Sequence, residues 1–221
     1  RNPGTWANGV KVASIDGLAD QVFTGINTTA FNAITVGMGV SQAVPSGTVL
    51  AGVGTTSILT GTFKGVVAKK NSADRSIEVK FVEYLTSAGV SSAKDYQENG
   101  VYQFSNPSTA DLKIFNSTGL GIATITDNVN PTDWFDAQTI EIRGETLFWN
   151  QLAERPGTSG YSASRNSRFD EVHVVVIDDD GDVTGNPGTI LEKHLNLSKA
   201  KDSEFGNGAI SYYRQFVANG S

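Results

Sequence analysis

The chain has 221 residues, of which 38% are hydrophobic and 18% are charged, a balance typical of a water-soluble globular protein with one large or two small domains. Its 17 basic and 23 acidic residues give a net charge of −6, which leaves no basic surplus to bind nucleic acid or an anionic membrane surface. The absence of cysteine excludes disulfides, thiolate zinc sites and thiol nucleophiles.

The sequence contains no apolar signal core and no run of about 18 apolar residues, so we expect neither targeting to a membrane nor insertion into one. It begins Arg1-Asn2 without an initiator methionine, and we expect a fragment or a processed piece of a longer protein. Its 24 glycines and 6 prolines, set among Thr, Ser and Asn, divide it into many short segments. This texture favours β structure.

The first predicted element is a strand near the N-terminus, in which Val10 and Val12 alternate with Lys11 and Asp16-Gly17 gives a turn signal. From about residue 19 to about residue 128 the sequence is rich in Gly, Thr and Ser, and short apolar pulses recur at the spacing of small barrels and sandwiches. The pulses are residues 33–40, 44–53, 62–69, 77–84, 101–104 and 122–125.

The clearest pair of strands in this region is 63–68 and 77–81, separated by a polar connector. Ile77, Val79 and Phe81 share one face because side chains alternate along a strand, whereas the residues between them face water. This pattern predicts a hairpin within a small barrel.

Residues from about 129 onward have denser aromatics and helical periodicity. Residues 171–177 are a nearly continuous β-branched run, typical of a strand covered on both faces. Asp180-Gly181 is predicted to turn, with 182–184 as the returning arm. Two amphipathic helices are then predicted, one from Thr189 through Leu195 and one over about 209–218, together with a short helical turn within 145–154.

These patterns predict an α+β, mostly β protein. Residues 1–18 plus 129–221 would form a β-sandwich or mixed-sheet domain with two or three helices, and residues 19–128 would form an inserted small antiparallel β-barrel domain. The change of composition at both borders is the basis of this division. Strands precede helices instead of alternating with them, which argues against βαβ units.

The acidic cluster at residues 178–182 is the most tempting site, because carboxylates at a glycine turn are the ligands of calcium loops. Aligning Gly181 with the glycine of such a loop puts Val176 at the first ligand position and Pro187 where the bidentate Glu belongs. The calcium hypothesis therefore fails, and a solvated turn without metal is predicted.

His173 and His194 are the only histidines, and neither stands in a zinc-protease motif or near a nucleophile elbow. We expect both to pack within the fold, since a general base needs a positioned nucleophile and the sequence offers none. No catalytic residue, metal or cofactor is predicted, and the protein is not expected to be an enzyme.

A different class of function is suggested by Asp133, Asp136 and Glu141, which could pair as carboxylates for glycoside hydrolysis. The nearby Trp134 and Trp149 could stack on sugar rings, although aromatic core packing is the better interpretation. The alternative hypothesis is therefore a carbohydrate-binding or glycan-cleaving β-sandwich.

Residues 2–12, NPGTWANGVKV, resemble the PGxWGN-then-strand signature of tail sheath proteins from contractile-tailed bacteriophages, with Ala7 where the family usually has Gly. Residues 173–181, 185–193 and 197–202 resemble the strand, acidic turn and "LE…LSKA.D" helix of these proteins, and 156–159 is similar to a segment of cyanophage sheaths. The residues that carry the family motifs are Pro3, Gly4, Trp6, Asn8, Asp180, Gly181, Leu191, Glu192, Leu197 and Ser198.

The resemblance covers residues 1 to about 15 and about 130 to 221, and it does not extend to the middle, about 19 to 128, where sheath proteins carry variable insertions. It implies a structural subunit of a myovirus-type contractile tail, whose contraction around the tail tube drives the tube through the host envelope and delivers the genome. The partners of the full protein would be neighbouring sheath subunits and the tail tube, within the virion and, during assembly, in the host cytoplasm. The expected fragment lacks the terminal arms and the C-terminal core that join subunits, so the isolated piece is expected to be a monomer.

Overall fold

The computed structural model describes residues 4–5, 9–17, 19–52, 55–143 and 145–220. The predicted class, α+β and mostly β, is confirmed. The chain divides into unit 1, residues 1–17 and 135–221, and unit 2, residues 18–134. None of the helices in the described ranges is long and apolar enough to cross a membrane.

The second border of unit 2 lies after Trp134, whereas the sequence places it after residue 128. Val129 belongs to the buried core of unit 2, and the two-residue strand Thr132–Asp133 pairs with a strand of the same unit. These contacts, made after the change in composition, extend unit 2 toward the C-terminus.

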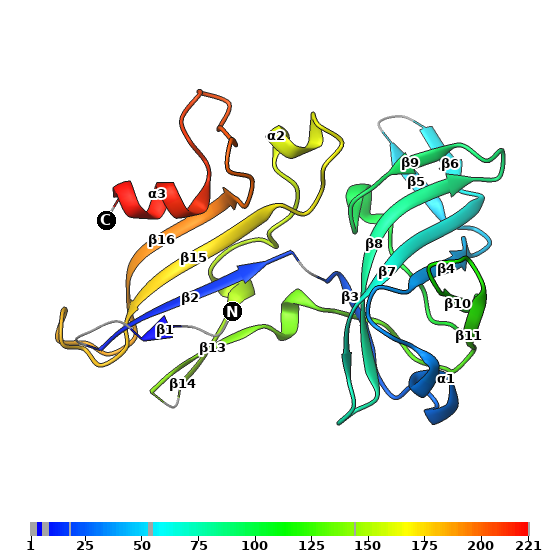
Figure 1. The fold of residues 1–221 in the computed structure, drawn as a ribbon, viewed down its shortest axis with the longest axis horizontal. Coiled ribbons are helices and arrows are strands. Elements are labelled where there is room, and N and C mark those ends of the chain that lie inside the picture. Colours follow the sequence, from blue (N-terminus) through cyan, green and yellow to red (C-terminus); the bar gives the residue numbers. More distant parts are fainter. Residues whose placement is uncertain (1–3, 6–8, 18, 53–54, 144, 221) are drawn as a thin grey trace. The chain divides into compact units, whose positions relative to one another are not determined.

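Unit 1 is built on one antiparallel sheet that joins the two ends of the chain (Figure 1). Its strand order is β1-β2-β15-β16, so strands from the beginning of the sequence lie beside strands from its last quarter. The elements of unit 1 are β1 Gly4–Thr5, β2 Val10–Asp16, the 3-10 turn Phe135–Ala137, β13 Thr139–Ile142, β14 Glu145–Phe148, the 3-10 turn Trp149–Gln151, α2 Gly160–Ala163, β15 Glu171–Asp178, β16 Thr189–Ser198 and α3 Tyr213–Gly220.

Strand β15 is covered on both faces, as its β-branched sequence predicts. Val172 and Val174 form a cluster with Leu197 of β16, against which residues of α3 pack. On the opposite face Val175 and Ile177 are fully buried. Side chains on both faces of β15 are therefore buried.

Unit 2 contains a larger antiparallel sheet with the strand order β11-β10-β4-β7-β8-β3-β12, in which β9 also pairs with β8. A separate hairpin is formed by β5 and β6. The elements are β3 Gln21–Phe23, α1 Thr28–Ala33, β4 Gly39–Ala43, β5 Val49–Gly52, β6 Thr55–Ile58, β7 Gly61–Asn71, β8 Ser76–Thr86, β9 Ser91–Ala93, the 3-10 turn Glu98–Gly100, β10 Leu112–Phe115, β11 Gly121–Ile125 and β12 Thr132–Asp133. Closure of this sheet into a barrel stays a prediction.

The predicted hairpin of unit 2 is confirmed as β7 and β8. Ile77, Val79 and Phe81 are fully buried, as their alternation predicts. The ring of Phe81 lies edge-on to Phe63 of β7, with 5.4 Å between the ring centroids. These residues anchor one continuous core of aliphatic and aromatic side chains.

The helix predicted from Thr189 through Leu195, which includes Leu191 and Glu192, is wrong, because these residues form β16. β16 pairs with β15 with two shifts of register, so that Leu191 is an extra residue between Glu192, opposite Val176, and Ile190, opposite Ile177. Each extra residue shifts the in–out alternation of the side chains along β16 by one position. With two such shifts, the apolar residues of the strand fall at spacings that are also found on one face of a helix. Pairing with the buried β15 outweighed the local propensity.

Other predictions need smaller corrections. Residues 182–184 belong to the turn, and the returning arm begins at Thr189. The last helix begins at Tyr213 instead of about 209, and the helical turn in 145–154 is limited to the 3-10 turn Trp149–Gln151. Residues 101–104 form no strand, while α1 was not predicted although Asn27 caps it by accepting a hydrogen bond from the Ala30 N–H.

Because each unit has its own sheet and its own buried cluster, we predict that each folds alone. A variant in which a short Gly/Ser linker replaces residues 18–134 should unfold in one cooperative thermal transition, followed by circular dichroism, and so should residues 18–134 expressed by themselves. Broad, non-cooperative melting or aggregation of both pieces would show instead that the units depend on a shared core.

Candidate functional site

The acidic turn between β15 and β16 is built around Asp178, whose side chain is fully buried. Its carboxylate accepts hydrogen bonds from the backbone N–H groups of Gly181 (2.9 Å), Val183 (3.2 Å) and Thr184 (2.7 Å), and from the Thr184 hydroxyl (2.8 Å). The prediction of a solvated turn is therefore wrong at this residue. Asp178 folds the loop back on itself and holds its backbone amides.

Hydrogen bonding controls the charge state of this carboxyl. Burial by itself raises the pKa of Asp178, but the hydrogen bonds from Thr184, Val183 and Gly181 together outweigh burial and hold the pKa below its ordinary value. The ionised carboxylate has its acceptor positions engaged by the protein. Within the described ranges no group of three or more His, Asp or Glu side chains is arranged to hold a metal ion.

Asp180 and Gly181, two of the motif residues, shape the outer part of the turn. Gly181 has a φ of +81°, and a Cβ atom there would lie 2.7 Å from the Pro187 ring, so only glycine fits. The Asp180 carboxylate pairs with the Nε of Arg143 at 2.8 Å, an exposed ion pair of little energetic weight.

The N-terminal motif contacts this same turn. The Gly9 carbonyl accepts hydrogen bonds from the Asp179 N–H (2.8 Å) and the Asp180 N–H (3.2 Å). Gly9 has a φ of +73°, and a Cβ atom there would lie 2.6 Å from the Cβ of Asp180. Two segments that are far apart in sequence but belong to the same resemblance are thus in direct contact.

The remaining N-terminal motif residues are only partly described. Gly4 lies in β1, opposite Val12 of β2. Pro3, Trp6 and Asn8 lie outside the described residues.

The motif residues of β16 serve different purposes. Leu191 and Glu192 are partly buried, and the Glu192 carboxylate lies 2.8 Å from the Nε2 of His194. Leu197 is buried in the cluster under α3. Ser198 is fully buried at the end of the strand, where its N–H donates to the Ser211 carbonyl at 2.8 Å.

Asp170, which sequence reasoning missed, is the partner of Ser198 in a buried polar network. Its carboxylate accepts hydrogen bonds from the Ser198 hydroxyl and from both the N–H (2.9 Å) and the hydroxyl (2.8 Å) of Ser159. Burial raises the pKa of Asp170, but these hydrogen bonds together lower it below its ordinary value. Ser159 is the N-cap of α2. Serine is a preferred N-cap residue, and this local preference is the one feature of the sequence that points to the network.

His173 is buried on β15 with both ring nitrogens engaged. Its Nδ1 accepts from the Asn196 N–H at 3.0 Å, so the proton of the neutral ring is on Nε2, which donates to the Glu154 carbonyl at 2.8 Å. Asn196, with a φ of 55°, lies in the second irregularity of β16. The packing role predicted for His173 agrees with this geometry, because the ring accepts a hydrogen bond from a backbone N–H group in the bulge of β16.

The residues that suggested carbohydrate chemistry are divided between the two units. Trp134 and Trp149 are each 3% exposed, so their predicted core packing is confirmed and neither offers a stacking face. Asp136 accepts a hydrogen bond from the Asn150 amide at 3.3 Å, and Glu141 accepts from the Thr146 hydroxyl at 3.2 Å. Asp133 belongs to the other unit, in β12.

In comparisons with known proteins, no family model, no curated protein and no solved structure matches this chain. The class defined by the fold and the site is thus a two-unit β-rich protein with a hydrogen-bonded acidic turn.

We predict that Asp178→Ala lowers the melting temperature by several degrees, because three backbone amides and one hydroxyl lose their acceptor inside the fold. Asp182→Ala is the matched control, since Asp182 is exposed in the same turn and should melt like the parent. Calorimetry of the two variants measures the difference. Equal melting temperatures would show that the buried carboxylate does not hold the turn.

We also predict that stability falls as the pH drops below about 6.5, the ordinary pKa of histidine. Burial lowers the pKa of His173 in the folded state, against a smaller raising effect of the Glu154 hydrogen bond. As the pH falls, the unfolded chain therefore binds a proton at His173 before the folded chain does. The contribution of neutral His173 to the free energy of unfolding is complete above pH 6.5. It is lost progressively as the pH falls from 6.5 to the pKa of His173 in the folded state. Its size is about 1.4 kcal/mol for each unit by which the pKa is lowered.

Urea unfolding at a series of pH values tests this, with His173→Gln and His194→Gln compared. His173→Gln should flatten the dependence near the histidine pKa, whereas His194→Gln should keep it. The same slope in His173→Gln and in the parent would contradict the assignment.

Proposed function

We propose that this chain is part of a structural subunit of a contractile phage tail sheath, of the myovirus type, and that it acts without catalysis. One observation carries the proposal: the segments that resemble sheath proteins, drawn from both ends of the chain, meet in unit 1. They supply adjacent strands of one sheet (Figure 1). The Gly9 carbonyl accepts hydrogen bonds from the Asp179 and Asp180 N–H groups of the acidic turn. Unit 2, which contains the sequence without resemblance, has its own core.

The construction of unit 1 suits a part that must transmit force without deforming. Asp178 fixes the turn, His173 fixes the bulge, and Asp170 joins the cap of α2 to the end of β16. Fully bonded buried polar groups are costly to separate, and so they hold a single conformation. In the full-length protein the partners are neighbouring sheath subunits and the tail tube, in the virion and, during assembly, in the host cytoplasm.

The alternative is a carbohydrate-binding or glycan-cleaving β-sandwich. It was suggested by Trp134 and Trp149 as residues that could stack on sugar rings, but both side chains are buried in the core. The carboxylates of Asp136 and Glu141 are also occupied by local hydrogen bonds. The sheath proposal is therefore preferred for the protein as a whole.

Electron microscopy of the full-length protein that contains this chain tests the proposal. We expect hollow tubes of stacked rings, and we expect Gly9→Val to prevent them, because its side chain would collide with Asp180. Gly37→Val is the matched control: Gly37 also has a positive φ, of +90°, but nothing lies within 4 Å of a Cβ there. Dispersed, folded particles under all conditions that assemble sheath proteins would reject the proposal.

The 221-residue chain alone should be a monomer. The resemblance implies that strand exchange between terminal arms and a C-terminal core supplies the lattice contacts, and the segments that carry the resemblance here match neither of these parts. Light scattering after size exclusion at micromolar concentration should give one mass near 23.4 kDa. A stable ring or filament would place the assembly surface within these residues.

A further inference from the structure

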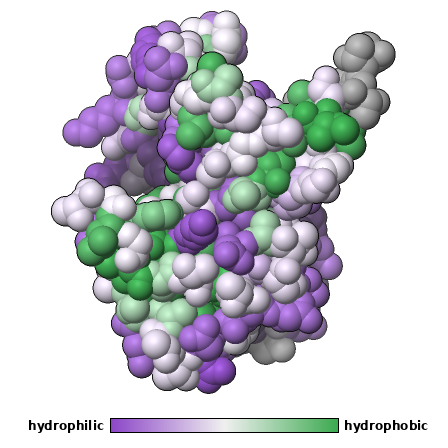
Figure 2. Space-filling model, turned by 90° about the vertical axis from the view of Figure 1, so that its right-hand side faces the viewer, coloured by the Kyte–Doolittle hydropathy of each residue, from purple (hydrophilic) through white to green (hydrophobic). Residues whose placement is uncertain are grey.

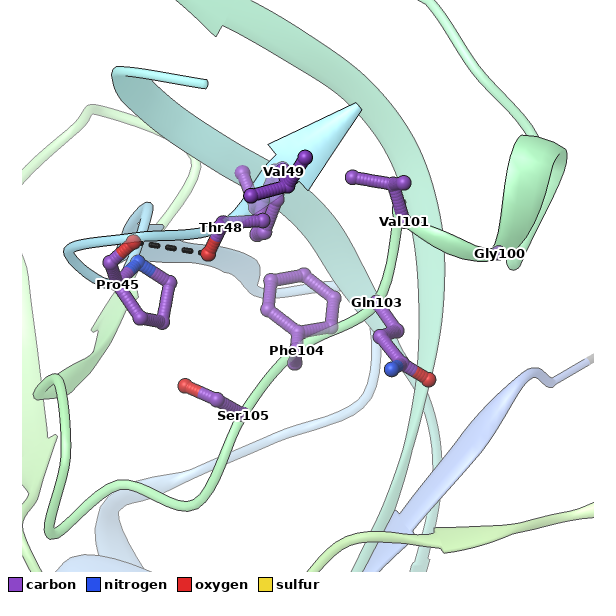
Figure 3. Close-up of a pocket in the computed structure, with 9 residues that line it drawn as sticks. Pro45, Thr48, Val49, Gly100, Val101, Gln103, Phe104 and Ser105 are labelled. Carbon is purple, nitrogen blue, oxygen red and sulfur yellow. Dashed lines mark hydrogen bonds between the residues drawn. The ribbon is translucent and has the colours of Figure 1, made fainter. Parts of the chain in front are cut away.

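Unit 2 contains a pocket of about 250 Å³ beside the β5–β6 hairpin (Figure 3). One wall is the turn that enters β5, and the other is the irregular segment that follows the 3-10 turn Glu98–Gly100. Figure 3 shows the Phe104 ring between these two walls. The lining residues are Pro45, Thr48, Val49, Phe63, Gly100, Val101, Gln103, Phe104 and Ser105.

Two buried glutamines fix the irregular wall. Gln21 is 3% exposed, and its amide accepts from the Phe104 N–H at 2.7 Å and donates to the Phe104 carbonyl at 2.9 Å. Gln42 is 1% exposed and makes the same pair of bonds to Ser105, at 2.8 and 3.0 Å. The segment 101–105, which is not part of a strand, is thus held in place by side-chain hydrogen bonds at Phe104 and Ser105.

The rest of the pocket is equally well defined. A Cβ atom on Gly65 would lie 2.9 Å from the Phe104 ring, so the glycine makes room for that ring. On the other wall, the Thr48 hydroxyl donates to the Pro45 carbonyl at 2.8 Å and closes the turn (Figure 3). The pocket is therefore formed before any ligand binds, which lowers the ordering cost of binding.

No charge contributes to this site. The sequence has no Asp, Glu, Lys or Arg between Asp20 and Lys64, nor between Glu98 and Asp111, and both walls come from these two stretches. Figure 2 shows hydrophobic surface over the β5–β6 hairpin, where Val49 and Ile58 face each other across the strands and are 40% and 67% exposed. A charged ligand would find no partner in the lining, so the ligand is neutral.

Size and chemistry narrow the ligand further. The volume is below the roughly 300–1,000 Å³ of pockets for drug-sized molecules, which indicates a single ring. The lining combines apolar groups with hydroxyl and amide groups, and a sugar ring presents C–H and O–H groups together. We propose that this pocket binds one ring of a neutral saccharide.

In this complex, Val49 and Val101 contact the apolar side of the sugar ring. Gln103 is exposed at the pocket, and its side-chain amide makes no hydrogen bond to another described residue, so it is available to donate to and accept from sugar hydroxyls. The Thr48 oxygen, which already donates its proton, accepts from another hydroxyl. The inference goes beyond the sheath proposal and does not depend on it.

Saturation-transfer NMR with the methyl glycosides of glucose, galactose, mannose and N-acetylglucosamine tests the inference on the 221-residue chain. At least one of them should bind at millimolar concentration and shift the backbone amides of residues 46–49 and 100–105, whereas glucuronic acid should not. Gln103→Leu should weaken binding about tenfold, the effect of losing one hydrogen bond. Gln215→Leu, the same change at an exposed position of α3 in unit 1, should leave binding unchanged.

A second pair of variants separates blocking from unfolding. Val49→Arg places a long charged side chain at the pocket and should abolish binding, while Val90→Arg, at a 62% exposed position between β8 and β9, should not. Both positions are at the surface, so the amide spectra should otherwise match the parent. The inference is overturned if none of the neutral glycosides binds, if Gln103→Leu binds as well as Gln215→Leu, or if indole binds there and the sugars do not. None of these outcomes bears on whether the full-length protein forms tubes.

Discussion

The antiparallel pairing of β2 with β15 is the interaction on which unit 1 depends. Its register runs from Val10 opposite Asp178 to Asp16 opposite Val172. The pair joins the two ends of the chain, and in the sequence all of unit 2 lies between the two strands. The entropy of closing so long a loop grows slowly, by about 0.6 kcal/mol for each doubling of its length. An inserted unit with its own core therefore adds little to the cost of forming this pair, while the buried side chains of β15 stabilise it.

Sequence reasoning succeeded where the pattern of side chains reflects burial directly. The β-branched run of β15 and the alternation of Ile77, Val79 and Phe81 each identify a strand and its buried face. It failed at β16, because extra residues at its bulges shift the alternation, and only the partner strand reveals them. Local spacing alone therefore cannot separate a bulged strand from an amphipathic helix.

The candidate site was predictable only as far as the motif residues. The resemblance marks Asp180, Gly181 and Ser198, but the residues that hold this region in place are Asp178, Asp170 and His173. Asp170 bonds to Ser198 and His173 bonds to Asn196 over 28 and 23 positions of sequence, and such hydrogen bonds depend on tertiary contacts and leave no periodic signal. The partners of Asp178 are local, but they are mostly backbone N–H groups, which no residue type identifies in the sequence. The calcium-loop comparison assigned Asp178 to solvent, because it treated every acid of the cluster alike, whereas its side chain is fully buried.

Both units use buried polar side chains to fix backbone that no strand partner can hold. Asp178 does so for the acidic turn, and Gln21 and Gln42 do so for residues 104 and 105. Such a group stabilises the fold only when all its hydrogen bonds are made, so each favours one conformation of its segment. In unit 1 the result is a fixed junction between the two chain ends. In unit 2 it is a preformed pocket wall, built from a separate stretch of sequence, so the pocket can be altered without disturbing the sheet of unit 1.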